Sequence, residues 1–188
     1  HELVLDEAVL NHSLLSNQLW QEGLDEDSDA GAGLRRETGR RIQRAKVREF
    51  ANLGVVKGYR YEDSPVIVPD GSPAPPHDFI NYVPSSRPGG IAPHLWLHDG
   101  SSLYDHFGNG FTLIAARHVA EAAIAPIRQQ ALDTGVPLAV LQPEEGAMAQ
   151  LYPRRFTLVR PDQHVVWRGD EWPQGLFTHV AGLAGREF

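Results

Sequence analysis

Two short apolar runs, residues 111–116 (FTLIAA) and 137–141 (PLAVL), are separated by one helical stretch at 119–132. Each run has the length of a strand buried on both faces. Turn residues precede both runs, Gly108-Asn-Gly110 before the first and Asp133-Thr-Gly135 before the second. A strand, a crossover helix and a second strand in one sheet form a parallel pair. The sequence therefore predicts an α/β fold with this pair in its core.

Two further strand patterns predict an antiparallel hairpin after this unit. Residues 156–159 (FTLV) and 164–167 (HVVW) flank the turn Arg160-Pro-Asp-Gln163, and a terminal helix is expected from 173 to about 183. Strand, helix, strand, hairpin and helix, in this order, are the layout of a thioredoxin-like domain. We expect such a domain over residues 91–188.

The chain contains no cysteine. A thioredoxin-like domain carries its reactive CxxC directly after the first buried strand, where this sequence has Ala116-Arg117-His118-Val119. Thiolate catalysis, disulfides and cysteine-based metal sites are therefore excluded. We expect the scaffold without its redox chemistry.

The amino-terminal part has a different pattern. Apolar residues recur at helical spacing over 2–20 and again over 34–53, and Gly54 is a natural stop for the second helix. Residues 55–90 are rich in proline and glycine and predict a connector of short extended pieces. We therefore expect three parts: two amphipathic helices in residues 1–54, a linker over 55–90, and the thioredoxin-like domain from 91.

Charge and hydropathy exclude several classes of partner. The formal net charge is −7, with 17 basic and 24 acidic residues, whereas a nucleic-acid binder needs an excess of Lys and Arg. Basic residues between 35 and 48 are expected to form a solvated helix face. The apolar runs are too short to cross a bilayer, and no signal-peptide pattern opens the chain. We expect no nucleic acid, no membrane and a cytoplasmic location.

No glycine-rich loop of the kind that cradles phosphates is complete. Gly31-Ala-Gly33 is followed by Arg36 where a third glycine belongs, and it lies between predicted helices. Gly108-Asn-Gly110 is followed by Leu113 and precedes a strand. Both are interpreted as turns, so we expect no cofactor bound by this chain alone.

Several histidines lie close together in the sequence, with His94, His98, Asp99, Asp105 and His106 within 13 residues. Residues 94–98 alternate as a strand does, and on that predicted strand His94 and His98 would share a face but lie about 13 Å apart at a rise of about 3.3 Å per residue. That distance is too long for one ion, so no metal site is expected. No catalytic residue is assigned either. The candidates for an interface or ligand-facing role are Arg87, His94, Trp96, His98 and Trp167.

Three segments resemble one enzyme family, the FAD-dependent aromatic-ring hydroxylases. Residues 87–113 (RPGGIAPHLWLHDGSSLYDHFGNGFTL) are similar to a motif in the carboxy-terminal part of these flavoprotein monooxygenases. Residues 156–169 (FTLVRPDQHVVWRG) resemble the closing hairpin. Residues 49–71 (EFANLGVVKGYRYEDSPVIVPDG) resemble the linking segment of the phenol, chlorophenol and polyketide hydroxylase branch. Ile91 departs from the pattern, because an arginine is common there.

The resemblance implies a parent enzyme that hydroxylates a phenolic or polyketide ring with FAD, NAD(P)H and O2. In the family the FAD-binding motifs lie amino-terminal to the part this chain matches. The resemblance therefore implies an amino-terminal FAD-binding region as partner, dimerisation or stability as the role, and no activity of this chain alone. A stand-alone module that binds a small ligand near His94, Trp96 and His98 stays open as the alternative.

Overall fold

The computed structural model describes residues 4–6, 8–9, 19–144 and 146–183. The chain divides into two compact units. Unit 1 is His1–Tyr59 with Pro76–Tyr82, and unit 2 is Arg60–Pro75 with Val83–Phe188. No helix in the described ranges is long and apolar enough to cross a membrane.

Unit 2 contains a four-stranded sheet in the order β2-β1-β3-β4. The strands are β1 (Phe111–Ala115), β2 (Leu138–Leu141), β3 (Phe156–Val159) and β4 (Val165–Gly169). β1 and β2 are parallel, with Phe111 opposite Leu138, and β3 is antiparallel to both β1 and β4. The predicted parallel pair and the predicted hairpin are both confirmed.

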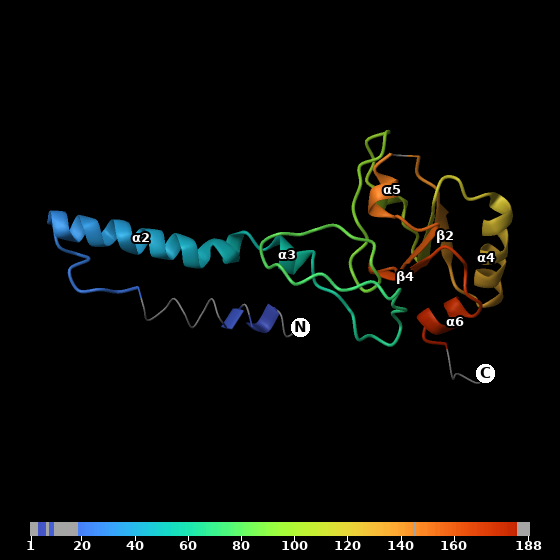
Figure 1. The fold of residues 1–188 in the computed structure, drawn as a ribbon, viewed down its shortest axis with the longest axis horizontal. Helices are drawn as coiled ribbons and strands as arrows, with labels where there is room; N and C mark the ends of the chain where they lie inside the picture. The colour runs from blue at the N-terminus through green and yellow to red at the C-terminus, as the bar shows by residue number, and fades with distance from the viewer. Residues whose placement is uncertain (1–3, 7, 10–18, 145, 184–188) are drawn as a thin grey trace. The chain divides into compact units, whose positions relative to one another are not determined.

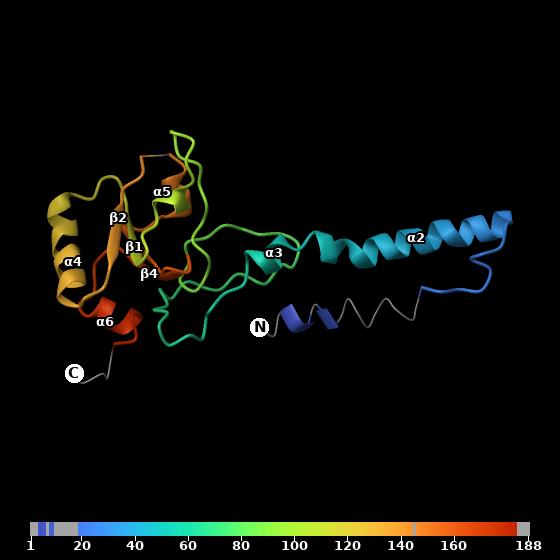
Figure 2. The same ribbon diagram turned by 180° about the vertical axis from the view of Figure 1, so that it is seen from behind.

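Two helices cover one face of this sheet. Ile124 and Ile127 of α4 (Glu121–Asp133) and Phe177 of α6 (Leu176–Val180) are buried against Leu113 and Leu158 in the larger core. Figure 1 and the reverse view in Figure 2 show α4 and α6 on this side of the strands, with α5 on the other side. The alternation of β1 and β3 side chains between the two faces explains why both strands are buried throughout.

A smaller core fills the opposite face. It joins Ile114 of β1 and Val159 of β3 to Met148 of α5 (Met148–Leu151) and Leu103 of the 3-10 helix η1 (Leu103–His106). Ser102 caps η1: its hydroxyl accepts from Tyr104 N–H, while Asp105 accepts from the Ser102 N–H. A short capped helix therefore follows the turn at Asp99-Gly100.

The strand predicted at His94–His98 is wrong. In this region only Ile91 and Trp96 form isolated bridges, to His164 and Ser102. The backbone turns back on itself instead, since Leu97 N–H donates to Ser101 O and Leu103 N–H to Leu95 O. Pro93 has no N–H to donate to a sheet ladder, and Gly100 takes a φ of 81° that favours a tight turn.

The outer edge of β4 is covered by segments from earlier in the chain. Val68 N–H donates to Val166 O, and Gly89 N–H donates to Val165 O. Both segments belong to unit 2. The division of the chain into helices up to residue 54, a linker over 55–90 and a thioredoxin-like domain from 91 stays a prediction.

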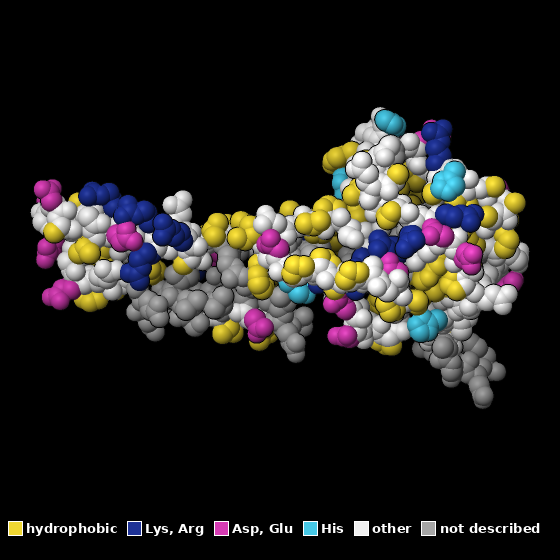
Figure 3. Space-filling view, viewed as in Figure 1, with side chains coloured by type: hydrophobic (Ala, Val, Ile, Leu, Met, Phe, Trp, Pro, Cys, Tyr) yellow, Lys and Arg dark blue, Asp and Glu magenta, His cyan; other side chains and the backbone are white. Residues whose placement is uncertain are grey.

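Unit 1 is built on a long helix, α2 (Asp29–Phe50), which begins earlier than the predicted residue 34. Ser28 is the reason, because its hydroxyl accepts from Gly31 N–H and caps the helix ahead of the glycines. Figure 3 shows Lys and Arg side chains gathered along α2, as expected for a solvated face. The helix predicted at 2–20 lies largely outside the described residues.

Gly54 has a different role from the predicted helix stop. α2 ends at its cap Ala51, and Gly54 lies inside a second short helix, α3 (Leu53–Val56). A Cβ at Gly54 would lie 1.8 Å from the carbonyl oxygen of Asp78. The glycine therefore permits a close backbone approach between α3 and residues 76–82 of the same unit.

Candidate functional site

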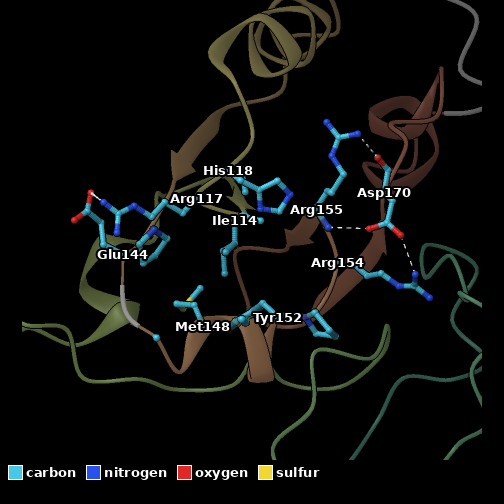
Figure 4. A pocket seen from close by; sticks show the side chains of 15 residues that line it. Ile114, Arg117, His118, Glu144, Met148, Tyr152, Arg154, Arg155 and Asp170 are labelled. Atoms are coloured by element: carbon cyan, nitrogen blue, oxygen red, sulfur yellow. Dashed lines mark hydrogen bonds and ion pairs between the residues drawn. The ribbon is translucent and has the colours of Figure 1, made fainter.

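A pocket of about 470 Å³ opens in unit 2 where the end of β1 meets the start of β3 (Figure 4). Ala115 pairs with Phe156, and the strands run antiparallel, so residues 116–118 lie beside residues 153–155. Residues of α5 and the side chain of Asp170, which follows β4, complete the wall.

The floor of the pocket is apolar. Ile114, Met148 and Tyr152 line it, and all three are largely buried, with exposed fractions of 2%, 8% and 5%. The Tyr152 hydroxyl donates to Pro93 O at 2.6 Å, so its polar atom is already used in the fold. What Tyr152 offers to the pocket is therefore its ring.

The rim is rich in basic side chains. Arg117 and His118 follow β1, and Arg154 and Arg155 precede β3. Asp170 accepts the Arg155 backbone N–H at 3.0 Å and the Arg154 side chain at 2.8 Å. The Arg155 backbone hydrogen bond, followed by Arg154, lowers the pKa of the Asp170 carboxyl below its ordinary value. Asp170 is therefore ionised at neutral pH and fixes the backbone at the start of β3.

The second carboxylate of the rim is loosely held. Glu144 lies 3.3 Å from Arg117, and both side chains are about two-thirds exposed, at 68% and 67%. An exposed pair of this kind contributes little stability. Arg117 therefore remains available to another anion.

The sequence-predicted residues do not form one surface. His94 and Trp96 do meet, ring against ring at 4.9 Å, and Trp96 is 67% exposed. Arg87 lies elsewhere in unit 2, in an ion pair with Glu62 at 2.7 Å. Trp167 is 7% exposed and packs in the larger core.

The loop of His98 forms a local hydrogen-bond network rather than a metal cluster. Ser101 donates to Asp99 at 2.6 Å, and its hydroxyl lies 2.7 Å from His106 Nε2. His94 Nε2 lies 3.0 Å from Ser102 Oγ. Among the residues that the structure describes, no three His, Cys, Asp or Glu side chains are grouped to hold a metal ion.

The pocket was not predicted from the sequence, although a signal for it existed. Basic pairs flank two strand patterns, with Arg117-His118 after the first and Arg154-Arg155 before the third. Those pairs meet only if the two strands are antiparallel neighbours, and the order of strands in the sheet is what brings them together.

The described part of the chain does not fit a dinucleotide such as FAD. That group needs a glycine turn between a strand and a helix, where the backbone approaches the pyrophosphate. β1 is followed by Ala116, Arg117 and His118, and Gly31 and Gly33 lie inside α2.

Comparison with known proteins decides the family. The model of the family described as aromatic-ring hydroxylase, C-terminal, matches residues 85–186. This chain belongs to that family. The match includes the sheet, the pocket and two of the three resembling segments, so the family predicted from the sequence is confirmed.

Curated relatives are FAD-dependent monooxygenases and aromatic hydroxylases. The FAD-dependent monooxygenase opdD of Penicillium oxalicum is 34% identical over 126 residues, 63% of this chain and 23% of the relative. Aklavinone 12-hydroxylase RdmE of Streptomyces purpurascens is 34% identical over 69% of this chain and 26% of its own length. The 2,4-dichlorophenol 6-monooxygenase of Delftia acidovorans is 30% identical over 65% and 24%. The chain thus spans about a quarter of the length of these relatives.

Solved structures agree with this relationship. RebC, a rebeccamycin biosynthetic enzyme, superposes with a TM-score of 0.84 at 31% identity, over 97% of this chain and 35% of that chain. An aklavinone-11 hydroxylase in complex with FAD and aklavinone gives a TM-score of 0.55 at 29% identity, over 68% and 27%. The fold is therefore that of the carboxy-terminal region of the hydroxylases, a mixed α/β structure.

Proposed function

We propose that this chain is the carboxy-terminal part of an FAD-dependent monooxygenase that hydroxylates a phenolic or polyketide ring with NAD(P)H and O2. One observation carries the proposal: 97% of this chain superposes on RebC but covers only 35% of that protein. The chain itself contributes structure and an interface, and alone it is inactive. The location we propose is the cytoplasm.

Unit 2 is, in this proposal, a thioredoxin-like domain that has lost its redox role. The sheet order β2-β1-β3-β4 and the helix α4 that connects the parallel strands support this assignment. The segment 116–119, where the redox pair would stand, contributes Arg117 and His118 to the pocket. Its chemistry is therefore ionic and hydrogen-bonding.

The partner we propose for unit 1 is the amino-terminal FAD-binding region of the same protein, with homo-oligomerisation as a further role of the chain. Large apolar side chains of unit 1 are exposed at α2 and α3, among them Phe50 at 86%, Leu53 at 53% and Val56 at 53%. Exposed apolar patches of this kind mark surfaces that pack against another protein part.

The test of the parent function is flavin retention. The purified chain is mixed with FAD, passed over a desalting column and examined for flavin absorbance. The matched control is the FAD-dependent monooxygenase opdD of Penicillium oxalicum, which we expect to retain its flavin. The chain is expected to emerge colourless. Stoichiometric FAD on the chain alone would contradict its assignment as the part without the flavin site.

A stand-alone module that binds a small ligand is the second candidate. The observation that favours it is the exposed pair His94 and Trp96, whose rings offer an aromatic and hydrogen-bonding surface. Thermal melting across a series of phenols distinguishes the two. A ligand-dependent rise in Tm that Trp96→Ala abolishes supports the module, and no shift with any phenol counts against it.

A further inference from the structure

The pocket at the end of β1 combines two kinds of surface, an apolar floor and a basic rim. Its floor is formed by Ile114, Met148 and the ring of Tyr152, and its rim carries Arg117, His118 and Arg155. In Figure 4 the His118 ring extends towards Arg155, while Ile114 extends towards Met148. A volume of about 470 Å³ lies within the range of small-molecule sites.

The charges of the rim do not cancel. Three arginines and His118 face two carboxylates, Glu144 and Asp170. The Arg154 side chain and the Arg155 backbone N–H already donate hydrogen bonds to Asp170, and Arg117 lies near Glu144. One positive charge is therefore left over, even with the histidine neutral.

Among the three rim arginines, Arg155 donates its guanidinium hydrogen bond to an uncharged group, although its charge also lowers the pKa of Asp170. Its guanidinium donates one hydrogen bond, at 3.3 Å, to the uncharged backbone carbonyl of Asp170, and it lies 5.5 Å from the centre of the Phe156 ring. A guanidinium has five N–H donors in a planar fork that matches a carboxylate. Arg155 is thus both held in place and able to bind an anion.

The apolar floor of the pocket determines which group the ligand carries besides its anionic group. Buried aliphatic and aromatic groups beside a methionine sulfur favour the face or edge of a ring over a hydrated ion. A plain anion such as phosphate would leave this apolar surface uncovered.

We propose that this pocket binds a small aromatic carboxylate. Its carboxylate group lies against Arg155 and His118, and its ring lies against Ile114, Met148 and Tyr152. The site requires no flavin and stands whether or not the chain is part of a hydroxylase.

The experiment is a titration of the full chain with naphthoate, followed by amide chemical shifts and by calorimetry. Shifts are expected at residues 115–118 and 154–155, with a dissociation constant of about 0.1–1 mM, as befits a ligand of this size. Naphthylmethanol, the uncharged analogue, is expected to bind about tenfold more weakly because it loses the charged hydrogen bonds. Acetate and inorganic phosphate, which lack the ring, are expected to be weaker still.

Two variants and one control complete the test. Arg155→Gln keeps the backbone N–H that Asp170 accepts and is expected to weaken naphthoate binding about tenfold. His118→Gln, at another exposed rim position, is expected to weaken it severalfold. Arg128→Gln, which makes the same charge change on the exposed side of α4, leaves it unchanged. Absence of shifts at the pocket, equal binding of acetate, or binding insensitive to both pocket variants would overturn the proposal.

Discussion

At the scale of single residues, one ion pair ties the segment before the sheet to β4. Asp70 lies 2.6 Å from Arg168, and the two side chains are only 7% and 11% exposed. Burial works against the charged carboxylate, but hydrogen bonds from Ser72 and Arg168 outweigh it and lower the pKa of Asp70 to about 2. Ser86 also accepts from Arg168, so both ends of the pair are satisfied.

Asp70→Asn is expected to destabilise unit 2 by about 3 kcal/mol, because it leaves the guanidinium of Arg168 buried without its counter-charge. The ion pair also makes the stability of the fold depend on pH. A carboxyl whose folded pKa is depressed stabilises the fold above its unfolded pKa, and this contribution disappears as pH falls towards the folded pKa. As the pH falls from about 3.8 to about 2, the free energy of unfolding of the wild-type chain should decrease by about 2 kcal/mol, because Asp70 becomes protonated.

Urea denaturation between about pH 2 and pH 7 measures both effects of the Asp70 substitution. Asp63→Asn is the control, since Asp63 is exposed and the same loss of charge should change stability little. The prediction is contradicted if Asp70→Asn is as stable as the wild type at pH 7. It is also contradicted if the free energy of unfolding of the variant decreases as steeply with falling pH as that of the wild type.

At the scale of elements, the sequence predicted well where local pattern and burial agree. Strands β1, β2 and the β3–β4 hairpin were predicted to within two residues, because short apolar runs between turn residues have few alternatives. The extended stretch at 94–98 alternates like a strand, yet Pro93 and Gly100 turn its hydrogen bonds into a local loop. Alternation alone does not reveal where the backbone partners lie.

The close approach at α3 gives a second prediction. Gly54→Ala should destabilise unit 1 by about 2–3 kcal/mol, because the added Cβ meets the Asp78 carbonyl and the backbone of residues 78–81 must move. Gly33→Ala is the matched control: Gly33 lies inside α2 and an added Cβ there has nothing within 4 Å. That change should stabilise the helix by about 0.5–1 kcal/mol. Thermal melting followed by circular dichroism compares them, and equal effects of the two changes would refute the close-packing role of Gly54.

At the scale of the whole molecule, the family and the class of fold were within reach of the sequence, but the pocket was not. The resembling motifs lie in continuous stretches, such as residues 87–113, and local sequence is enough to carry them. The pocket depends on strand order, which brings Arg117 beside Arg155 across nearly forty positions of sequence. His94 and Trp96 lie two positions apart and so could be linked from the sequence, whereas Trp167 is placed by the packing of the core.

The exposed apolar residues of unit 1 lead to the last prediction. If an FAD-binding region normally covers α2 and α3, the chain alone must bury Phe50, Val47 and Leu53 against something else, and other copies of the chain are available in a pure sample. Sedimentation velocity should therefore show an apparent mass that rises with concentration.

The double variant Val47→Ser, Phe50→Ser should remain monomeric at concentrations where the wild type associates. Leu132→Ser removes an apolar side chain that is 73% exposed on α4, and it should associate as the wild type does. A wild-type chain that stays monomeric at every concentration would favour a self-sufficient module over a part that awaits its flavin-binding partner.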